Sequence, residues 1–535
     1  MRRRVAPPSE EVPHVIASAS PQPDPSGTAI APPRPPEGTR FALPLLGALS
    51  RRELLLFAST FCLLLMTWTP RLSQTFYAGD DYGMSRVEGP QEIRGLMLGQ
   101  GRFGLALVLW LQDELGAPYS HTVTLYTWMA LLLMSLASVL LVRLWRLTDE
   151  GWLPFVVCPL VFIHPYFAEL WAFRGMPGLA CLSLVPAMLA TERARLHGWK
   201  GLPGATLLLA VSFSVYQTSF NVLAAVIAVG ALLALGRSEG TRLEARRVLQ
   251  EWLPIACLLP LGSLCYLLVN KAVQLIFRPP TLTRTAFLDL NDAPERLRAL
   301  DQLFTHVMLH DQVFSTRLLT GLQVALVVIA LMLTAVQVWK QRSPTKGAWM
   351  LILSCISVLA TVGLLLLLKE WWPTPRTRVA FAFAIGGHLA LAYTLSGPRL
   401  RPVLVTLSSL LLWGFAGVNQ QLSADQFLVN RIDRTTAQKV SFLQEQNPEL
   451  RDLLKVGFVN HPYAYPGTRV DGDTNVSALA ISWSHAGLMQ VVTGRPYKPI
   501  DGRESALGVQ ECANGPKWPD ERSLRHVEQL LFVCF

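Results

Sequence analysis

Long apolar runs recur along most of this 535-residue chain, and short clusters of Lys and Arg separate them. Hydrophobic residues make up 51% of the sequence and charged residues only 16%, which leaves too little polar surface to cover a water-soluble protein of this length. The runs approach the length of about 20 residues that a helix needs to cross a bilayer. The pattern therefore predicts a polytopic, all-α membrane protein.

The charged clusters between the runs give an orientation. Arg51 and Arg52 stand directly before the first run, so the N-terminus is predicted to lie on the cytoplasmic side. With this orientation the later Lys and Arg clusters fall into cytoplasmic loops, which explains the net charge of +10 better than nucleic-acid binding does. We expect about eleven transmembrane helices, with the C-terminal region on the extracytoplasmic side.

Three parts of the chain are predicted from composition. Residues 1–50 are rich in Pro, Ser and Arg and lack apolar periodicity, which is typical of a disordered cytoplasmic tail. Residues 51–422 form the transmembrane domain. Residues 423–535 begin with a helical pattern and continue with short apolar runs, which predicts a small extracytoplasmic α/β domain. Within the transmembrane domain, the longer outer loops are expected at residues 70–121 and 270–317.

Two of the eight cysteines lie in the polar C-terminal region, and the other six lie within apolar runs. The six are most simply small hydrophobic residues of the membrane helices. Cys512 and Cys534 have a different setting. If their region is extracytoplasmic, a disulfide between them is expected.

An acidic pair, Asp80 and Asp81, follows the first span by a few residues and lies in the first outer loop. Carboxylates so close to a membrane are costly unless they have a partner or a chemical role. They fit a helix N-cap or a solvated turn. They also fit a general base that takes a proton from a hydroxyl, with its neighbour orienting it. Two oxygen ligands for a divalent metal are the third interpretation.

Five short motifs together resemble a known family. They are Asp80-Asp81-Tyr82 with Arg86, Gly101-Arg102-Phe103, Val215-Tyr216-Gln217, the stretch from Pro375 to Arg378, and Asn430-Arg431-Ile432-Asp433. This set is similar to that of the Gtr type II membrane glucosyltransferases, which modify bacterial O-antigen (lipopolysaccharide) and have a GT-C-like design. The resemblance implies a polyprenyl-phosphate-glucose donor, an acidic motif in the first extracytoplasmic loop and a surface glycan as acceptor. It covers roughly residues 54–450 of the chain.

Four arginines are candidates for binding the donor phosphate. Arg86 and Arg102 flank the acidic pair, and each could bind phosphate through a bidentate guanidinium contact, neutralise a carboxylate, or contact lipid head groups. Arg376 and Arg378 stand where the tenth span begins on the outer face. The positive-inside rule disfavours arginine there, which favours a phosphate role. Because these cations can stabilise a departing phosphate, no metal or other cofactor is predicted, with a divalent ion kept as an alternative.

Three further residues at the outer face are candidates for binding sugar or acceptor. Tyr216 and Gln217 end the fifth span, where a phenol and an amide could bond sugar hydroxyls or serve helix–helix contacts. Glu169 is most simply the partner of Arg174 in a local ion pair. It is also the reserve carboxylate if the acidic pair proves structural.

His306 and His310 have the i, i+4 spacing of some metal sites. No Glu general base follows the first histidine, and the segment is otherwise amphipathic. A helix face that lies on the membrane accounts for it better, so no metal-ligating residues are predicted.

We therefore expect an integral-membrane glycosyltransferase that moves a hexose from a polyprenyl-phosphate sugar to a glycan acceptor at the outer leaflet. Its expected partners are these two substrates, membrane lipid and a flippase that delivers the donor, and not nucleic acid. A flippase or carrier for lipid-linked sugars is the alternative. Carriers place ionisable residues near the bilayer midplane and show internal repeats, and neither feature is evident here. A structural subunit of a polysaccharide assembly complex is a third interpretation, and it would leave the acidic pair replaceable.

Overall fold

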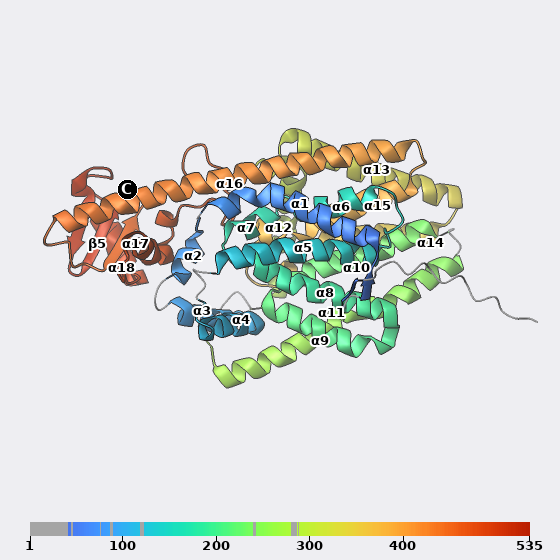
Figure 1. Ribbon diagram of the computed structural model, residues 1–535, viewed down its shortest axis with the longest axis horizontal. Coiled ribbons are helices and arrows are strands. Elements are labelled where there is room, and N and C mark those ends of the chain that lie inside the picture. The colour runs from blue at the N-terminus through green and yellow to red at the C-terminus, as the bar shows by residue number, and fades with distance from the viewer. Residues whose placement is uncertain are drawn as a thin grey trace, which may run out of the picture.

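The computed structural model describes residues 41–43, 47–74, 76–85, 89–117, 122–238, 242–279, 286 and 288–535. Most of the predicted tail, residues 1–50, lies outside these ranges. At its end, β1 (Phe41–Leu43) and β2 (Gly47–Leu49) pair as antiparallel strands. Figure 1 shows an elongated molecule in which a bundle of helices carries a small α/β domain at one end.

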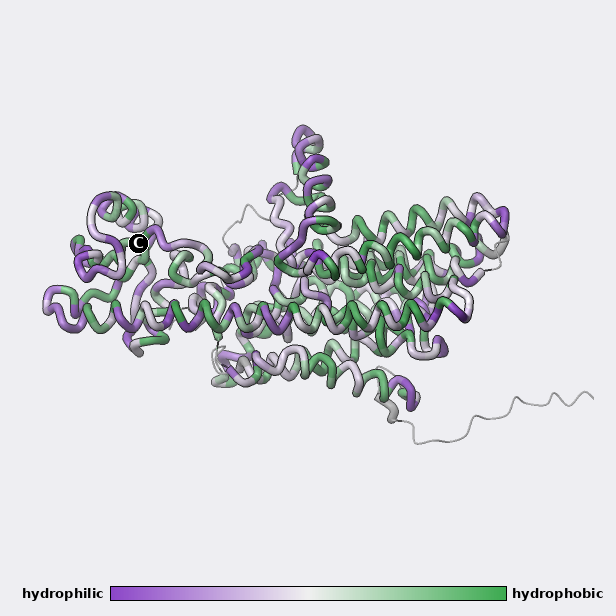
Figure 2. Tube along the Cα trace, turned by 90° about the horizontal axis from the view of Figure 1, so that it is seen from above, coloured by the Kyte–Doolittle hydropathy of each residue, from purple (hydrophilic) through white to green (hydrophobic). Residues whose placement is uncertain are grey.

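Six helices of the described residues are long and apolar enough to cross a membrane. They are α1 (Arg51–Ser73), α5 (Val123–Trp145), α10 (Ser219–Arg237), α11 (Arg242–Phe277), α13 (Arg317–Gln341) and α16 (Leu400–Gln446). The other runs predicted to be spans are also helical, as α6 (Leu153–Ile163), α8 (Met176–His197), α9 (Leu202–Val215), α14 (Pro344–Leu359) and α15 (Ala380–Leu395). In Figure 2 the helices of the bundle are coloured mostly green, which marks hydrophobic residues. The prediction of a mostly helical membrane protein is confirmed.

Short helices connect the long ones. They are α2 (Gly79–Met84), α3 (Gly89–Gly99), α4 (Phe103–Glu114), α7 (Phe167–Ala172) and α12 (Ala293–Thr305), which continues into a π-helical turn, His306–His310. The two histidines of the predicted amphipathic segment stand at the ends of that turn. No group of three or more His, Cys, Asp or Glu side chains in the described part of the chain is arranged to hold a metal ion.

Small residues let the central helices approach closely. A Cβ atom added to Gly230 would lie 2.1 Å from the Trp252 ring, and one added to Gly387 would lie 2.4 Å from Val229. Helices in lipid associate through such close packing, because lipid tails are as apolar as the side chains themselves. The helices α10 and α15 are accordingly buried almost all round.

Helix α16 does not end where the last predicted span ends. The transmembrane domain was predicted to end at residue 422, yet the helix continues to Gln446. At about 1.5 Å per residue it is far longer than the roughly 30 Å of a hydrocarbon core. Its hydropathy falls after Val418, but the helix contains no Gly or Pro beyond that residue, and buried residues such as Val429 and Val440 continue its apolar stripe. The second half of α16 therefore links the bundle to the C-terminal domain, as Figure 1 shows.

The C-terminal domain has the predicted α/β character. Strand β3 (Lys455–Val459) runs parallel to β5 (Leu530–Cys534), and β4 (Leu524–Val527) pairs antiparallel with β5 on its other side. Helices α17 (His485–Thr493) and α18 (Gly502–Glu511) complete the domain.

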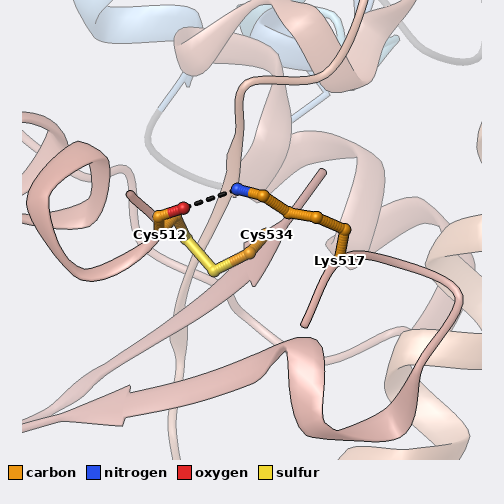
Figure 3. The surroundings of a disulfide bond; sticks show 3 residues. All are labelled: Cys512, Lys517 and Cys534. Atoms are coloured by element: carbon orange, nitrogen blue, oxygen red, sulfur yellow. Dashed lines mark hydrogen bonds between the residues drawn. A yellow bond between two sulfur atoms is a disulfide. The ribbon is translucent and has the colours of Figure 1, made fainter. Parts of the chain in front are cut away.

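The expected disulfide is present. It joins Cys512, just after α18, to Cys534 at the end of β5, with 5.2 Å between the two Cα atoms. Figure 3 shows this bond and the Lys517 ammonium, which donates a hydrogen bond to the Cys512 carbonyl. The covalent link ties the helical layer of the domain to its central strand.

We expect acid to destabilise the C-terminal domain through His485. This ring is fully buried, and its Nδ1 accepts a hydrogen bond of 3.3 Å from the Phe458 amide. Burial lowers the pKa of His485 from 6.5 to about 4. The stabilisation is therefore complete above pH 6.5 and is lost as the pH falls toward 4, by up to about 3 kcal/mol. Thermal unfolding of the purified protein between pH 7 and pH 4 measures it, and an equal slope in His485→Gln would contradict the assignment.

Candidate functional site

The acidic pair lies on α2, a short helix pressed against the C-terminal domain. A Cβ atom on Gly79 would lie 2.6 Å from Ile481, and one on Gly487 would lie 1.8 Å from the Tyr82 carbonyl oxygen. The contact at Gly487 is with backbone, so only glycine permits it. Segments about 400 residues apart in sequence therefore meet at the site.

Asp81 is the buried member of the pair, with 1% of its surface exposed. Its carboxylate accepts the Ala78 amide at 2.8 Å, which satisfies one of the donors left open at the start of α2. It also accepts the Arg174 amide at 3.1 and 3.2 Å. The buried guanidinium of Arg71, on α1, lies within electrostatic range. Asp81 thus fixes α2 to the turn before α8. The predicted N-cap position is occupied by Ala78, and Asp81 stabilises the helix start from the third helical position instead.

Replacing Asp81 with Asn is expected to destabilise the outer end of the molecule by about 1–3 kcal/mol. An amide in this position would turn an NH₂ group toward the backbone amides of Ala78 or Arg174 and leave a buried donor unsatisfied. Thermal unfolding in detergent measures the loss. An unchanged unfolding temperature would show that these amides do not depend on the carboxylate.

Asp80 is the exposed member of the pair. Its Oδ1 accepts a hydrogen bond of 2.9 Å from the indole N–H of Trp483, in the C-terminal domain. The side chain is thereby oriented while it still meets solvent. Asp80, unlike Asp81, can reach a hydroxyl of a bound substrate.

The polar motif of α16 holds the chain just before the pair. The side chain of Asn430 accepts the Tyr77 amide and donates to the Tyr77 carbonyl, both at 2.7 Å. The Tyr77 ring stacks on Tyr82 with 4.8 Å between centroids. Asn430 therefore acts as a clamp that sets the position of α2 against α16.

Arg174, whose backbone amide bonds to Asp81, has a guanidinium group whose hydrogen-bond donors are not all satisfied by the described residues. Its guanidinium carbon lies 4.2 Å from the centroid of the Tyr77 ring, and only 9% of the residue is exposed. Its Nε and Nη1 are buried, and neither has a hydrogen-bond partner in the part of the chain that is described. A buried charge with unsatisfied donors is costly. The arrangement favours a bound anion.

The predicted ion pair between Glu169 and Arg174 is wrong. Glu169, on α7, instead accepts the Arg376 amide at 2.5 Å, the Arg376 guanidinium at 3.3 Å and the Asp473 amide at 2.8 Å. The backbone amide of Arg174 bonds to Asp81, and its guanidinium lies over the Tyr77 ring. Sequence proximity had favoured the wrong partner.

For Glu169 and Arg376, burial and the neighbouring charges shift the pKa in opposite directions. Burial raises the pKa of Glu169, although the Arg376 guanidinium opposes the shift. Burial alone would lower the pKa of Arg376, but the carboxylates of Glu169 and Asp473 outweigh it and raise the pKa above its usual range. Arg376 therefore keeps its charge.

One loop of the C-terminal domain, residues 471–473, pairs with both Arg376 and Arg378. The guanidinium of Arg376 bonds to Asp473, and that of Arg378 bonds to Asp471 at 3.0 Å. Gly472, between the two acids, has a φ of +58°, and a Cβ atom there would lie 2.4 Å from Glu169. The Nε of Arg378 is buried without a partner among the described residues.

The arginine cluster and the acidic pair lie on two sides of the turn that follows α7. Arg376 lies over the Phe173 ring, with 5.0 Å from its guanidinium carbon to the centroid. The next residue, Arg174, donates its amide to Asp81. Both groups of charged residues therefore belong to the same end of the helix bundle.

The motifs predicted on α9 and before α4 also meet. The Arg102 Nε donates to Gln217 at 3.1 Å, and its guanidinium carbon lies 5.1 Å from the Tyr216 ring centroid. Gln217 donates in turn to the Gln100 carbonyl and to Tyr266, so its amide serves helix–helix contacts. Tyr216 also lies within electrostatic range of Arg376. Arg86 lies outside the described residues.

Sequence reasoning missed several residues of the site. Arg71 carried a usable signal, because in the predicted topology it stands at the extracytoplasmic end of the first span, where the positive-inside rule disfavours arginine. Nothing in the local sequence marked Trp483, Asp471 or Asp473, since their roles arise only when the C-terminal domain folds back onto the bundle.

A comparison with protein-family models matches residues 71–388 to a family described as glucosyl transferase GtrII. The match covers more than half of the 535 residues and includes α2, the α7–α8 turn and both outer arginines. It stops before α16 and the C-terminal domain. A search of curated proteins finds no match to the chain.

Proposed function

The chain belongs to the GtrII family of glucosyltransferases, and on that premise we propose that it transfers glucose from a polyprenyl-phosphate donor to a surface glycan such as O-antigen. The proposal places about eleven spans of GT-C-like design in a bacterial inner membrane. The N-terminal tail, residues 1–50, faces the cytoplasm. The transmembrane domain, residues 51–422, and the C-terminal domain, residues 423–535, bring the site to the periplasmic side.

Two observations carry the proposal: the carboxylate of Asp80 is exposed and oriented by Trp483, and Arg174, whose backbone amide bonds to the adjacent Asp81, is a buried arginine with unmatched donors. Asp80 is the general base in this proposal. As the acceptor oxygen forms its bond to the anomeric carbon, the bond from that carbon to the phosphate oxygen breaks. The phosphate leaves with the electron pair, and the acceptor proton moves to Asp80. Asp81 positions α2 and does not react.

The leaving phosphate requires positive charge. The unmatched Nε and Nη1 of Arg174 support a contact between this residue and the phosphate. Sequence reasoning had instead paired Arg174 with Glu169. Arg376 and Arg378 add charge nearby, and a phosphate would share them with Asp473 and Asp471 or displace these acids. Arg86 and Arg102 remain predicted contacts from the sequence alone. With this many cations the proposed step requires no metal or other cofactor.

Acceptor and sugar contacts are proposed for the remaining residues. The stacking of Arg102 on Tyr216 supports a role for Tyr216 and Gln217 in shaping the sugar pocket. Glu169, fully buried under Arg376, contributes by holding that arginine in place. A separate flippase would deliver the lipid-linked sugar to the outer leaflet.

Mass spectrometry of the surface polysaccharide, with and without this gene, tests the proposed function. We expect the repeating unit to lose one hexose branch in the deletion strain and to regain it on complementation. A polysaccharide of unchanged mass and branching would overturn the proposal. Lipid-linked intermediates measured in the same strains show whether the donor is still made.

A further inference from the structure

The structure points to a sugar-binding platform in the C-terminal domain, and we propose that Trp483 is the surface on which the acceptor sugar stacks. The inference rests on the proposed function and extends it to the acceptor. Trp483 lies outside the segment that matches the family model, residues 71–388. The part of the chain that follows this segment would then provide the acceptor contact.

The exposure and the bonding of Trp483 are unusual together. The residue is 55% exposed, yet its one polar group donates to Asp80 at 2.9 Å. One edge of the indole is therefore fixed at the carboxylate while much of the ring remains open. A pyranose presents apolar C–H groups on its faces and hydroxyls on its rim. A sugar stacked on the ring would direct rim hydroxyls toward Asp80.

The segment that carries the ring is held rigidly. Trp483 lies in a 3₁₀ turn, Ser482–Ser484, in which the buried Ser484 hydroxyl bonds to the carbonyls of Ala478 and Ile481 at 2.5 and 2.6 Å. The Ala478 amide donates to Asp433 of α16 at 2.7 Å, and Ile481 packs against Gly79. A platform held in this way loses little conformational entropy when a ligand binds.

Anchoring to the membrane interface is the competing role for an exposed tryptophan. An anchor uses its N–H toward head groups or water. Here a carboxylate of the same molecule takes that donor, and this carboxylate is the proposed base. The geometry favours a substrate contact over an anchor.

Calorimetric titration of the purified full-length protein tests the platform without any donor. The probe is the polysaccharide released by mild acid from a strain that lacks this gene, so that its acceptor positions are unmodified. We expect Trp483→Ala to weaken binding about tenfold or more, and Trp483→Phe, which keeps an apolar ring, to stay within about threefold of wild type. Trp199→Ala removes a similarly exposed tryptophan from the turn before α9 and serves as the control, with no expected change.

The outcomes separate the platform from the proposed function. Absence of binding by the wild type, equal binding by Trp483→Ala, or equal losses in the Phe and Ala variants would each overturn the platform. Asp80→Asn should bind the polysaccharide and fail to glycosylate it. If the wild type binds as expected but transfers no sugar, the proposed function fails while the platform stands.

Discussion

Asp80→Asn is expected to lower the rate of sugar transfer by about 10²–10⁴-fold, the usual contribution of a positioned general base. The asparagine oxygen can still accept the Trp483 N–H, so α2 and its surroundings should be unchanged. What is lost is the ability to take the acceptor proton. Initial rates with the purified protein at saturating substrates, together with its unfolding temperature, measure both effects.

Asp81→Asn is the matched comparison, because it makes the same chemical change one residue further along the chain. Asp81 accepts backbone amides and is buried, so its variant should lose stability first and activity as a consequence. Wild-type turnover by Asp80→Asn, or a loss of stability as large as that of Asp81→Asn, would refute the division of roles.

Arg174→Gln is expected to lower kcat/KM for the lipid-linked donor by about 10²–10³-fold with a loss of stability of only about 1 kcal/mol. Its Nε and Nη1 groups have no hydrogen-bond partner among the described residues, so the loss comes from the contact between the guanidinium and the Tyr77 ring. The backbone amide that binds Asp81 remains. Kinetics at varied donor concentration and thermal unfolding check the two halves of the prediction.

Arg376→Gln provides the contrasting control. That change leaves the buried Glu169 without its cation, and breaking a buried pair in this way costs about 3–5 kcal/mol. Its loss of activity should accompany a loss of fold, and the double variant with Glu169→Gln should recover much of the stability. If Arg174→Gln also unfolds the protein, or if it uses the donor normally, the proposed phosphate contact is incorrect.

Hydropathy predicted the helices well because every helix that crosses a membrane must be predominantly apolar. It failed at α16, because the helix continues beyond the apolar span as an amphipathic helix without a break. The strands β3 (Lys455–Val459) and β5 (Leu530–Cys534) were within reach of the sequence, since buried strands are short and apolar. The disulfide was also within reach, because only two cysteines lay in a polar region.

The site was predictable in composition but not in its pairings. The sequence shows Asp80 and Asp81 as equivalents, and only the fold distinguishes them, by turning one toward the amide of Arg174 and the other toward Trp483. Glu169 has Arg174 five residues away, yet it bonds to Arg376, 207 residues away. Such choices depend on which segments the folded bundle brings together.

The account is tested most directly with purified protein in liposomes that contain polyprenyl-phosphate glucose with a radiolabelled sugar. The released surface polysaccharide is supplied outside as acceptor. We predict that the label passes into the polysaccharide as free polyprenyl phosphate accumulates, and that Asp80→Asn stops this transfer. Label that crosses the bilayer without acceptor and stays on the lipid, with no new glycosidic bond, would contradict the account and identify a carrier.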